Sequence, residues 1–168
     1  MKQEIDAEWF QNVGHQHKGN IGEALVDVHI TNRFESDKDP FPPLFEGEFH
    51  PARRKEGVRS AGFYMEEIGE DAFEGMSWLP DLRYAINKPD EHGSQDLLVE
   101  VKTGEYAEFE RNQKRVMGML NASAEYAVLI ASVYFQRDPI AEIRYATLEP
   151  DSNSNSQYRK RELNRVSD

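Results

Sequence analysis

The chain has 168 residues, a formal net charge of −11 and 38% hydrophobic residues, which fits one domain with a buried core. No stretch approaches the roughly 18 apolar residues of a membrane span, and the acidic start lacks the features of a secretory signal, so we expect a soluble, cytoplasmic protein with no membrane partner. The absence of cysteine excludes disulfides, thiolate metal sites and a cysteine nucleophile.

Two helices are predicted before the first proline-rich stretch. Residues 4 to 13 have the spacing of a short amphipathic helix, and residues 20 to 32 form a stronger candidate with two apolar stripes. Neighbouring elements should therefore cover much of the second helix. Its Glu23 lies three and seven residues before Val26 and Ile30, so this acid shares a face with apolar side chains.

The rest of the chain alternates strands with one more helix. Four prolines predict an irregular insertion at about 34–51. The order helix, three strands, helix, strand predicts an α/β fold whose mixed sheet is flanked by helices, in one domain over residues 1–150 with a polar, flexible tail at 151–168. Strands are predicted at 60–68, 79–87, 96–104, 126–135 and 141–149, and the helix at 105–122.

An acid and a base interrupt the apolar segment LLVEVKTG, residues 97 to 104. Alternation along a strand puts Glu100 and Lys102 on one face. If the preceding strand folds back in a hairpin, Asp81 lies near residues 100 to 102. A shared face requires Asp81 to lie opposite Glu100 or Lys102 and not Val101, with the hairpin midpoint within residues 90 to 92.

Two carboxylates at cross-strand distance form a site for a hard cation such as Mg²⁺ or Mn²⁺, which completes its shell with water and substrate phosphate. A nearby lysine can orient or help deprotonate an attacking water, or stabilise charge on the phosphate. These parts together describe metal-assisted hydrolysis of a phosphodiester. The alternative is a surface salt bridge between Lys102 and one of the acids, which contributes little to stability.

The residues Pro80-Asp81, then eighteen residues, then Glu100-Val101-Lys102 resemble the signature of the PD-(D/E)XK nuclease superfamily. The resemblance implies a restriction-endonuclease-like core of helix, three strands, helix and strand over roughly residues 20 to 135. It also implies that Asp81 and Glu100 bind the divalent metal and that Lys102 assists the attacking water. The substrate implied is DNA.

Two further positions are similar to auxiliary residues of that superfamily. Glu23 resembles an acid of the first helix that supplements the metal site, and Gln113 resembles a glutamine that contacts the site from the helix after the lysine. Gln113 is also the polar member of an otherwise apolar helical stripe. Met117 departs from the RecB-like pattern, which prefers tyrosine there, so no subfamily is assigned. An ordinary solvated acid and a glutamine bonded to backbone remain the alternatives.

Positive groups cluster locally despite the acidic total charge. They are candidates for contacts with backbone phosphates, the alternative being a solvated charged surface. Cleavage of both DNA strands would favour a homodimer. A rival function is a catalytically inactive nuclease fold that acts as an acidic protein-interaction module. The candidate DNA-binding residues are Arg53, Arg54, Lys55, Arg59, Arg111, Lys114 and Arg115.

Overall fold

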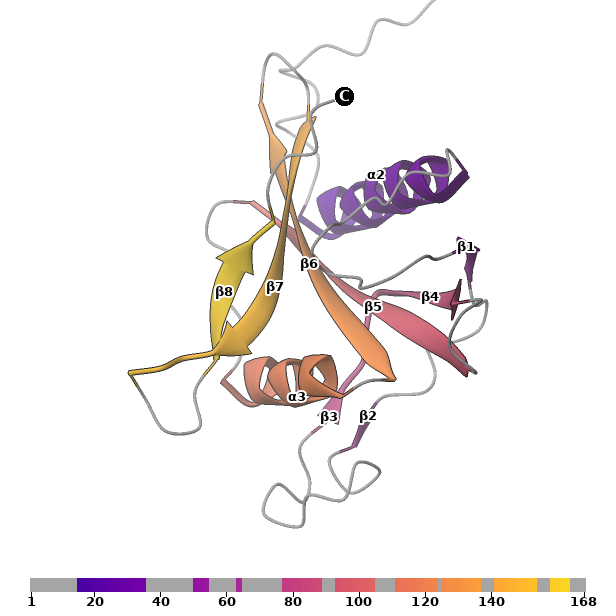
Figure 1. The fold of residues 1–168 in the computed structure, drawn as a ribbon. Helices are drawn as coiled ribbons and strands as arrows, with labels where there is room; N and C mark the ends of the chain where they lie inside the picture. Colours follow the sequence, from indigo (N-terminus) through magenta and orange to yellow (C-terminus); the bar gives the residue numbers. More distant parts are fainter. Residues whose placement is uncertain are drawn as a thin grey trace, which may run out of the picture.

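The computed structural model describes residues 15–35, 50–54, 63–64, 77–88, 93–104, 111–123, 125–136, 141–153 and 158–163. Within these ranges, six strands form one sheet in the order β1-β4-β5-β6-β7-β8, and two short strands, β2 and β3, form a second sheet. The elements, shown in Figure 1, are α2 (His15–Glu35), β1 (His50–Arg54), β2 (Phe63–Tyr64), β3 (Ser77–Trp78), β4 (Leu82–Lys88), β5 (Gly93–Thr103), α3 (Arg111–Ala122), β6 (Tyr126–Phe135), β7 (Ala141–Pro150) and β8 (Tyr158–Glu162).

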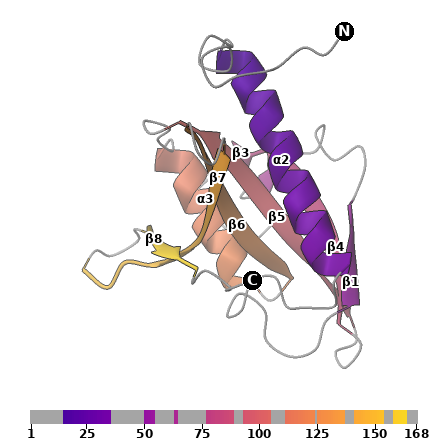
Figure 2. The same ribbon diagram turned by 90° about the horizontal axis from the view of Figure 1, so that it is seen from above.

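The large sheet is mixed. β5 and β6 are parallel, and every other neighbouring pair in it is antiparallel. The parallel pair is the one joined through α3, as a crossover connection requires, and the antiparallel pair β4–β5 is joined by a short connection. Figure 2 shows the sheet lying between α2 and α3. The predicted α/β fold with a mixed sheet flanked by helices is therefore confirmed.

Each face of the sheet carries its own apolar core, because side chains alternate along the strands. In β5, Leu97 and Val99 belong to the core under α2, whereas Leu98 belongs to the core under α3. Burial on both faces explains why β5 and β6 are almost continuously apolar. The helices contribute Val26 and Ile30 from α2, and Val116, Met117 and Leu120 from α3.

Several boundaries differ from the sequence prediction. The third strand beside β4 and β5 is β1, whereas the predicted strand at 60–68 is described only at β2, which pairs with β3 in the small sheet. The predicted helix at 4–13 and most of the 34–51 insertion lie outside the described residues. None of the helices in the described part of the chain combines the length and the apolar character needed to cross a bilayer.

The segment predicted as a polar tail contains β8, which pairs with the last half of β7. Its sequence, YRKRE, has no apolar alternation, so the strand pattern is absent from the sequence. Cross-strand charge pairs take the place of that pattern. The carboxylate of Glu149 in β7 forms ion pairs with the guanidinium groups of Arg159 and Arg161 in β8, at 2.7 and 3.3 Å.

Gly22 sets how closely α2 approaches the end of β5. A Cβ at Gly22 would overlap Cγ2 of Thr103, whereas a Cβ at Gly19 in the same helix would meet no atom within 4 Å. We expect Gly22→Ala to lower the free energy of unfolding by about 1–3 kcal/mol through overpacking. Gly19→Ala should raise it by about 0.5–1 kcal/mol through helix propensity. Denaturant unfolding of both variants measures this difference, and equal effects would contradict the close contact.

Candidate functional site

The pairing of β4 with β5 fixes the position of Asp81. The paired residues run from Leu82 with Val99 to Lys88 with Gly93, so the connection is centred near residues 90 and 91, as predicted. The regular register ends there, and Asp81 precedes the first paired residue of β4. The backbone N–H of Asp81 donates to the carbonyl of Val99, the residue that pairs with Leu82, at 3.0 Å, so Asp81 lies beside Val99 at the irregular start of β4.

β4 begins at Leu82 rather than at residue 79, and Pro80 provides the reason. Proline has no N–H to donate, so the β4–β5 ladder cannot continue through it. The carboxylate of Asp81 takes part in the contact with β5 instead: its Oδ2 accepts a hydrogen bond from the N–H of Val101 at 2.7 Å. Backbone N–H groups of a strand lie in the plane of the sheet. This oxygen of Asp81 therefore lies at the end of β4, beside the backbone that joins Glu100 to Lys102.

Glu100 is a buried acid, only 5% exposed, on the face of the sheet that α3 covers. Three donors surround its carboxylate. Oε1 accepts from the amide of Gln113 at 2.6 Å and contacts Nζ of Lys102 at 2.9 Å, and Oε2 accepts from the indole N–H of Trp78 at 2.7 Å. The carboxylate is thus held in one orientation by groups from β3, β5 and α3.

The surface salt bridge considered from the sequence does not describe this arrangement. The Lys102 side chain is 20% exposed and that of Glu100 6%, so the pair is largely shielded from solvent. The other acid on this face of β5, Asp96, lies four residues away and pairs with Arg83, whose Nε donates to its Oδ2 at 2.6 Å. The two acids of β5 therefore belong to separate clusters.

Gln113 reaches Glu100 because α3 packs its apolar stripe against the sheet. Three residues of α3 are fully buried against the sheet: Val116, Met117 and Leu120. Gln113 lies one turn before Met117 on the same stripe. Its amide therefore projects towards the sheet at the level of Glu100. The first residues of the predicted helix, 105 to 110, lie outside the described residues.

Sequence reasoning did not single out Trp78. It lies in β3, three residues before Asp81, and is 3% exposed within the core under α3. A buried indole N–H needs an acceptor, and a buried carboxylate needs donors. That complementarity is the signal the sequence contained, but nothing in it indicated which acid would lie within reach of Trp78.

A family model described as the PD-(D/E)XK nuclease superfamily domain matches residues 58–142, half of the chain. The chain belongs to the PD-(D/E)XK nuclease superfamily. The match includes Asp81, Glu100, Lys102 and Gln113, and it ends within β7. No curated protein and no solved structure matches the chain.

Members of the PD-(D/E)XK superfamily typically use divalent metal ions, and the carboxylate oxygens of this site suit such an ion. A carboxylate has about four lone-pair positions, of which three on Glu100 are taken by Gln113, Lys102 and Trp78. The fourth position, on Oε2, is left for a cation. Mg²⁺ commonly takes only one or two protein carboxylates and fills its shell with water and phosphate. Glu100 and Asp81 are sufficient in number for that type of site.

Glu23 belongs to α2, on the other side of the sheet from Glu100. It is half-buried on α2, which covers the opposite face of the sheet, although Gly22 beside it packs against the end of β5. Among the described residues, no three acidic or histidine side chains come together as a metal-binding group. Glu23, Asp81 and Glu100 therefore do not form a three-carboxylate site in this conformation.

The predicted DNA-binding residues fall on three parts of the chain. Lys114 and Arg115 are half-buried on α3, the helix that supplies Gln113. Arg53 and Arg54 lie in β1 and Arg111 begins α3, but their side chains are outside the description. Lys55 and Arg59 also lie outside the described residues. The part of the basic surface that the structure places is therefore on α3.

Proposed function

We propose that this PD-(D/E)XK protein is a Mg²⁺- or Mn²⁺-dependent nuclease that hydrolyses phosphodiester bonds in DNA. The observation that carries the proposal is the buried carboxylate of Glu100, held 2.9 Å from the ammonium group of Lys102, with the carboxylate of Asp81 bonded to the N–H of Val101 between them. Such a combination of fixed acid, base and neighbouring acid is costly to bury unless it serves a site.

In this proposal Asp81 and Glu100 hold the metal ion, and Glu23 of α2 is an auxiliary ligand. A bound Mg²⁺ or Mn²⁺ would polarise the phosphate and make a coordinated water more acidic. The protein would contribute the orientation of the ligands: Gln113 and Trp78 fix the plane of the Glu100 carboxylate from two sides. Fixed ligands reduce the reorganisation needed during reaction.

Lys102 is proposed to orient the attacking water or to stabilise negative charge on the phosphate. Its ammonium group already contacts Oε1 of Glu100, so it lies next to the carboxylate proposed to hold the metal. Lys114 and Arg115 of α3, together with Arg53, Arg54, Lys55, Arg59 and Arg111, are the proposed contacts with backbone phosphates.

The proposal is tested by incubating the protein with supercoiled plasmid and with labelled duplex, flap, junction and single-stranded DNA in Mg²⁺ or Mn²⁺. We expect cleavage that stops in EDTA and falls at least about 100-fold in Lys102→Ala, the size typical of losing a group that acts in proton transfer or charge stabilisation. Arg161→Ala removes a cation whose partner is Glu149 of β7 and should retain cleavage.

Absence of cleavage of every DNA structure with either metal would contradict the nuclease proposal. It would favour the acidic interaction module considered from the sequence. Retention of full activity in Lys102→Ala would contradict the assigned site specifically, because activity would then come from elsewhere in the chain.

A further inference from the structure

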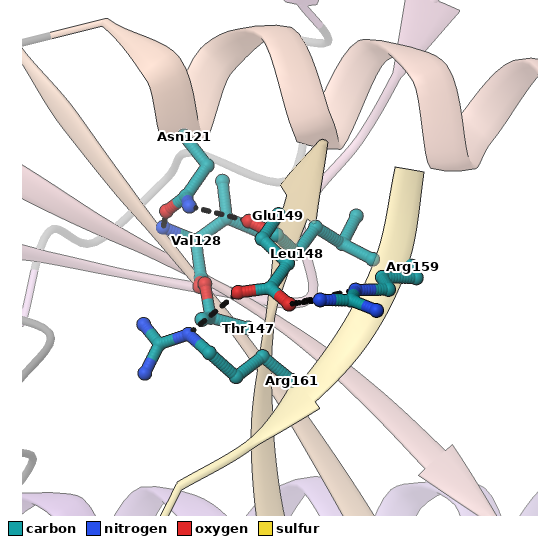
Figure 3. Close-up of polar contacts among 7 residues, drawn as sticks. All are labelled: Asn121, Val128, Thr147, Leu148, Glu149, Arg159 and Arg161. Carbon is teal, nitrogen blue, oxygen red and sulfur yellow. Dashed lines mark hydrogen bonds and ion pairs between the residues drawn. The ribbon is translucent and has the colours of Figure 1, made fainter. Parts of the chain in front are cut away.

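The β6–β7 ladder opens at one point, and a side chain from α3 fills the opening. Regular pairing runs from Phe135 with Ala141 to Ile130 with Ala146, and its continuation would pair Val128 with Leu148. Instead the amide of Asn121 lies between those two residues, accepting from the N–H of Val128 and donating to the carbonyl of Leu148, both at 2.8 Å (Figure 3).

Thr147 completes the opening, because its hydroxyl donates to the carbonyl of Val128 at 2.7 Å. Side chains thus replace the direct bonds between the two strands, and the second half of β7 separates from β6 while the N–H and carbonyl of Val128 and the carbonyl of Leu148 keep partners. β8 pairs with residues 146 to 150 of β7, a stretch that includes the part separated from β6.

The separation brings β8 against α3. A Cβ at Gly118 of α3 would overlap the ring of Tyr158, the first residue of β8, so the ring lies directly on the helix backbone. Only glycine permits so close an approach. Tyr158 is accordingly packed against the core under α3, although two strands, β6 and β7, separate β8 from β5 in the sheet.

This packing directs Lys160 towards the candidate site. Lys160 pairs with Leu148, a member of the core under α3, and so shares the α3-facing surface with Tyr158. Lys114 lies one helical turn before Gly118 and one residue after Gln113. Arg159, by contrast, is on the other face of β8 and pairs with Glu149, as Figure 3 shows.

The charges of Lys102 and Lys114 act on Lys160. Desolvation lowers the pKa of Lys160 below its ordinary value, and the ammonium groups of Lys114 and Lys102 lower that pKa further, against an opposing effect of Glu162. The cations of β5 and α3 therefore both repel the ammonium group of β8. A bound anion would relieve this repulsion.

We propose that β8 is part of the substrate-binding surface, and that Lys160, together with Lys114, binds DNA backbone phosphates next to the phosphodiester at Lys102. This inference rests on the proposed function. β8 lies beyond residue 142, where the match to the superfamily model ends, so the contact is an addition of this chain to the matched region.

A phosphodiester backbone suits the spacing of these groups better than a single small anion. The lysines come from three separate elements, and a nucleic-acid strand presents one negative charge per nucleotide along such a path. Lysine on a flexible stem binds phosphate as a point charge and needs no fixed geometry. Lys102 would act at the reacting phosphate, whereas Lys114 and Lys160 would hold phosphates beside it.

The test compares Lys160→Gln with Arg159→Gln, which removes the same charge from the neighbouring residue on the opposite face of β8. Binding of a labelled DNA duplex is measured over a range of salt concentrations, with Ca²⁺ in place of Mg²⁺. We expect Lys160→Gln to weaken binding about fivefold near 0.1 M salt and to reduce the salt slope by about 0.9, the value for one phosphate contact. Arg159→Gln should bind like the wild type.

Cleavage in Mg²⁺ is measured in parallel, so that the two proposals can fail separately. Equal binding by Lys160→Gln, Arg159→Gln and the wild type would overturn the role of β8, whether or not DNA is cleaved, and so would a wild type that does not bind DNA. Selective loss of binding in Lys160→Gln without cleavage by the wild type would support the β8 contact and overturn the nuclease proposal. Thermal melting of both variants confirms that each remains folded.

Discussion

Glu100→Gln is expected to lower the free energy of unfolding by about 2 kcal/mol and to abolish metal-dependent cleavage. All three groups around the Glu100 carboxylate are donors: the Gln113 amide, the Lys102 ammonium and the Trp78 indole. A carboxamide has one acceptor oxygen and one donor NH₂. In either orientation its NH₂ meets a buried donor, and an unsatisfied buried polar group costs about 1–3 kcal/mol.

The change in stability is measured by denaturant unfolding, and corresponds to a fall of about 4–8 °C in Tm for a chain of this size. Glu149→Gln is the matched control, since Glu149 also has two cationic partners, Arg159 and Arg161, but in a side chain that is 30% exposed. That change should cost less than about 1 kcal/mol. Equal losses in the two variants would contradict the proposal that Glu100 is held by three buried donors.

The part of the site that the sequence predicted depends on local periodicity. Alternation within one strand placed Glu100 and Lys102 together, and helical spacing placed Gln113 on the apolar stripe of α3; the structure brings all three into contact. The predicted strand at 126–135 coincides with β6 for the same reason, because its apolar run is long and uninterrupted. Periodicity fixes the direction of a side chain but not its partner in another element.

What the sequence did not predict depends on contacts between distant elements. Trp78 reaches Glu100 from 22 residues away, and the orientation of Asp81 depends on how Pro80 interrupts a ladder. β8 has no apolar pattern of its own and is fixed by charge pairs to β7 and by the approach of Tyr158 to Gly118. Each of these depends on the complete sheet, so no window of sequence contains the signal.

The opposite face of the sheet shows the same limit. His29 of α2 and Tyr145 of β7 are 116 residues apart, yet their rings stack with centroids 5.5 Å apart and Nδ1 of His29 lies 2.6 Å from the Tyr145 hydroxyl. Arg33 can only donate to Nε2 of His29, so in the neutral ring Nδ1 carries the proton and donates to Tyr145. Burial raises the pKa of Tyr145, which keeps this hydroxyl neutral.

Asn121→Asp is expected to lower the free energy of unfolding by about 3 kcal/mol and to weaken DNA binding in the same way as Lys160→Gln. The carboxylate keeps the shape of the amide and can still accept from the N–H of Val128, but it has no donor for the carbonyl of Leu148. Two acceptors would then face each other in a partly buried site, at the cost of an unpaired carbonyl and a desolvated charge.

Because the Asn121 amide holds β6 and β7 apart, its loss should also release the constraint that places β8 against α3. Denaturant unfolding measures the stability, and duplex binding with Ca²⁺ measures the effect on Lys160. Asn153→Asp is the control: Asn153 is exposed, and only its backbone N–H is used, in a bond to Asp151, so its side chain can change within about 0.5 kcal/mol. Asn121→Asp could instead lower the stability and leave the salt dependence of DNA binding unchanged. That result would show that the opening between β6 and β7 contributes to stability but does not position Lys160. The packing of Tyr158 on Gly118 would then be what positions Lys160.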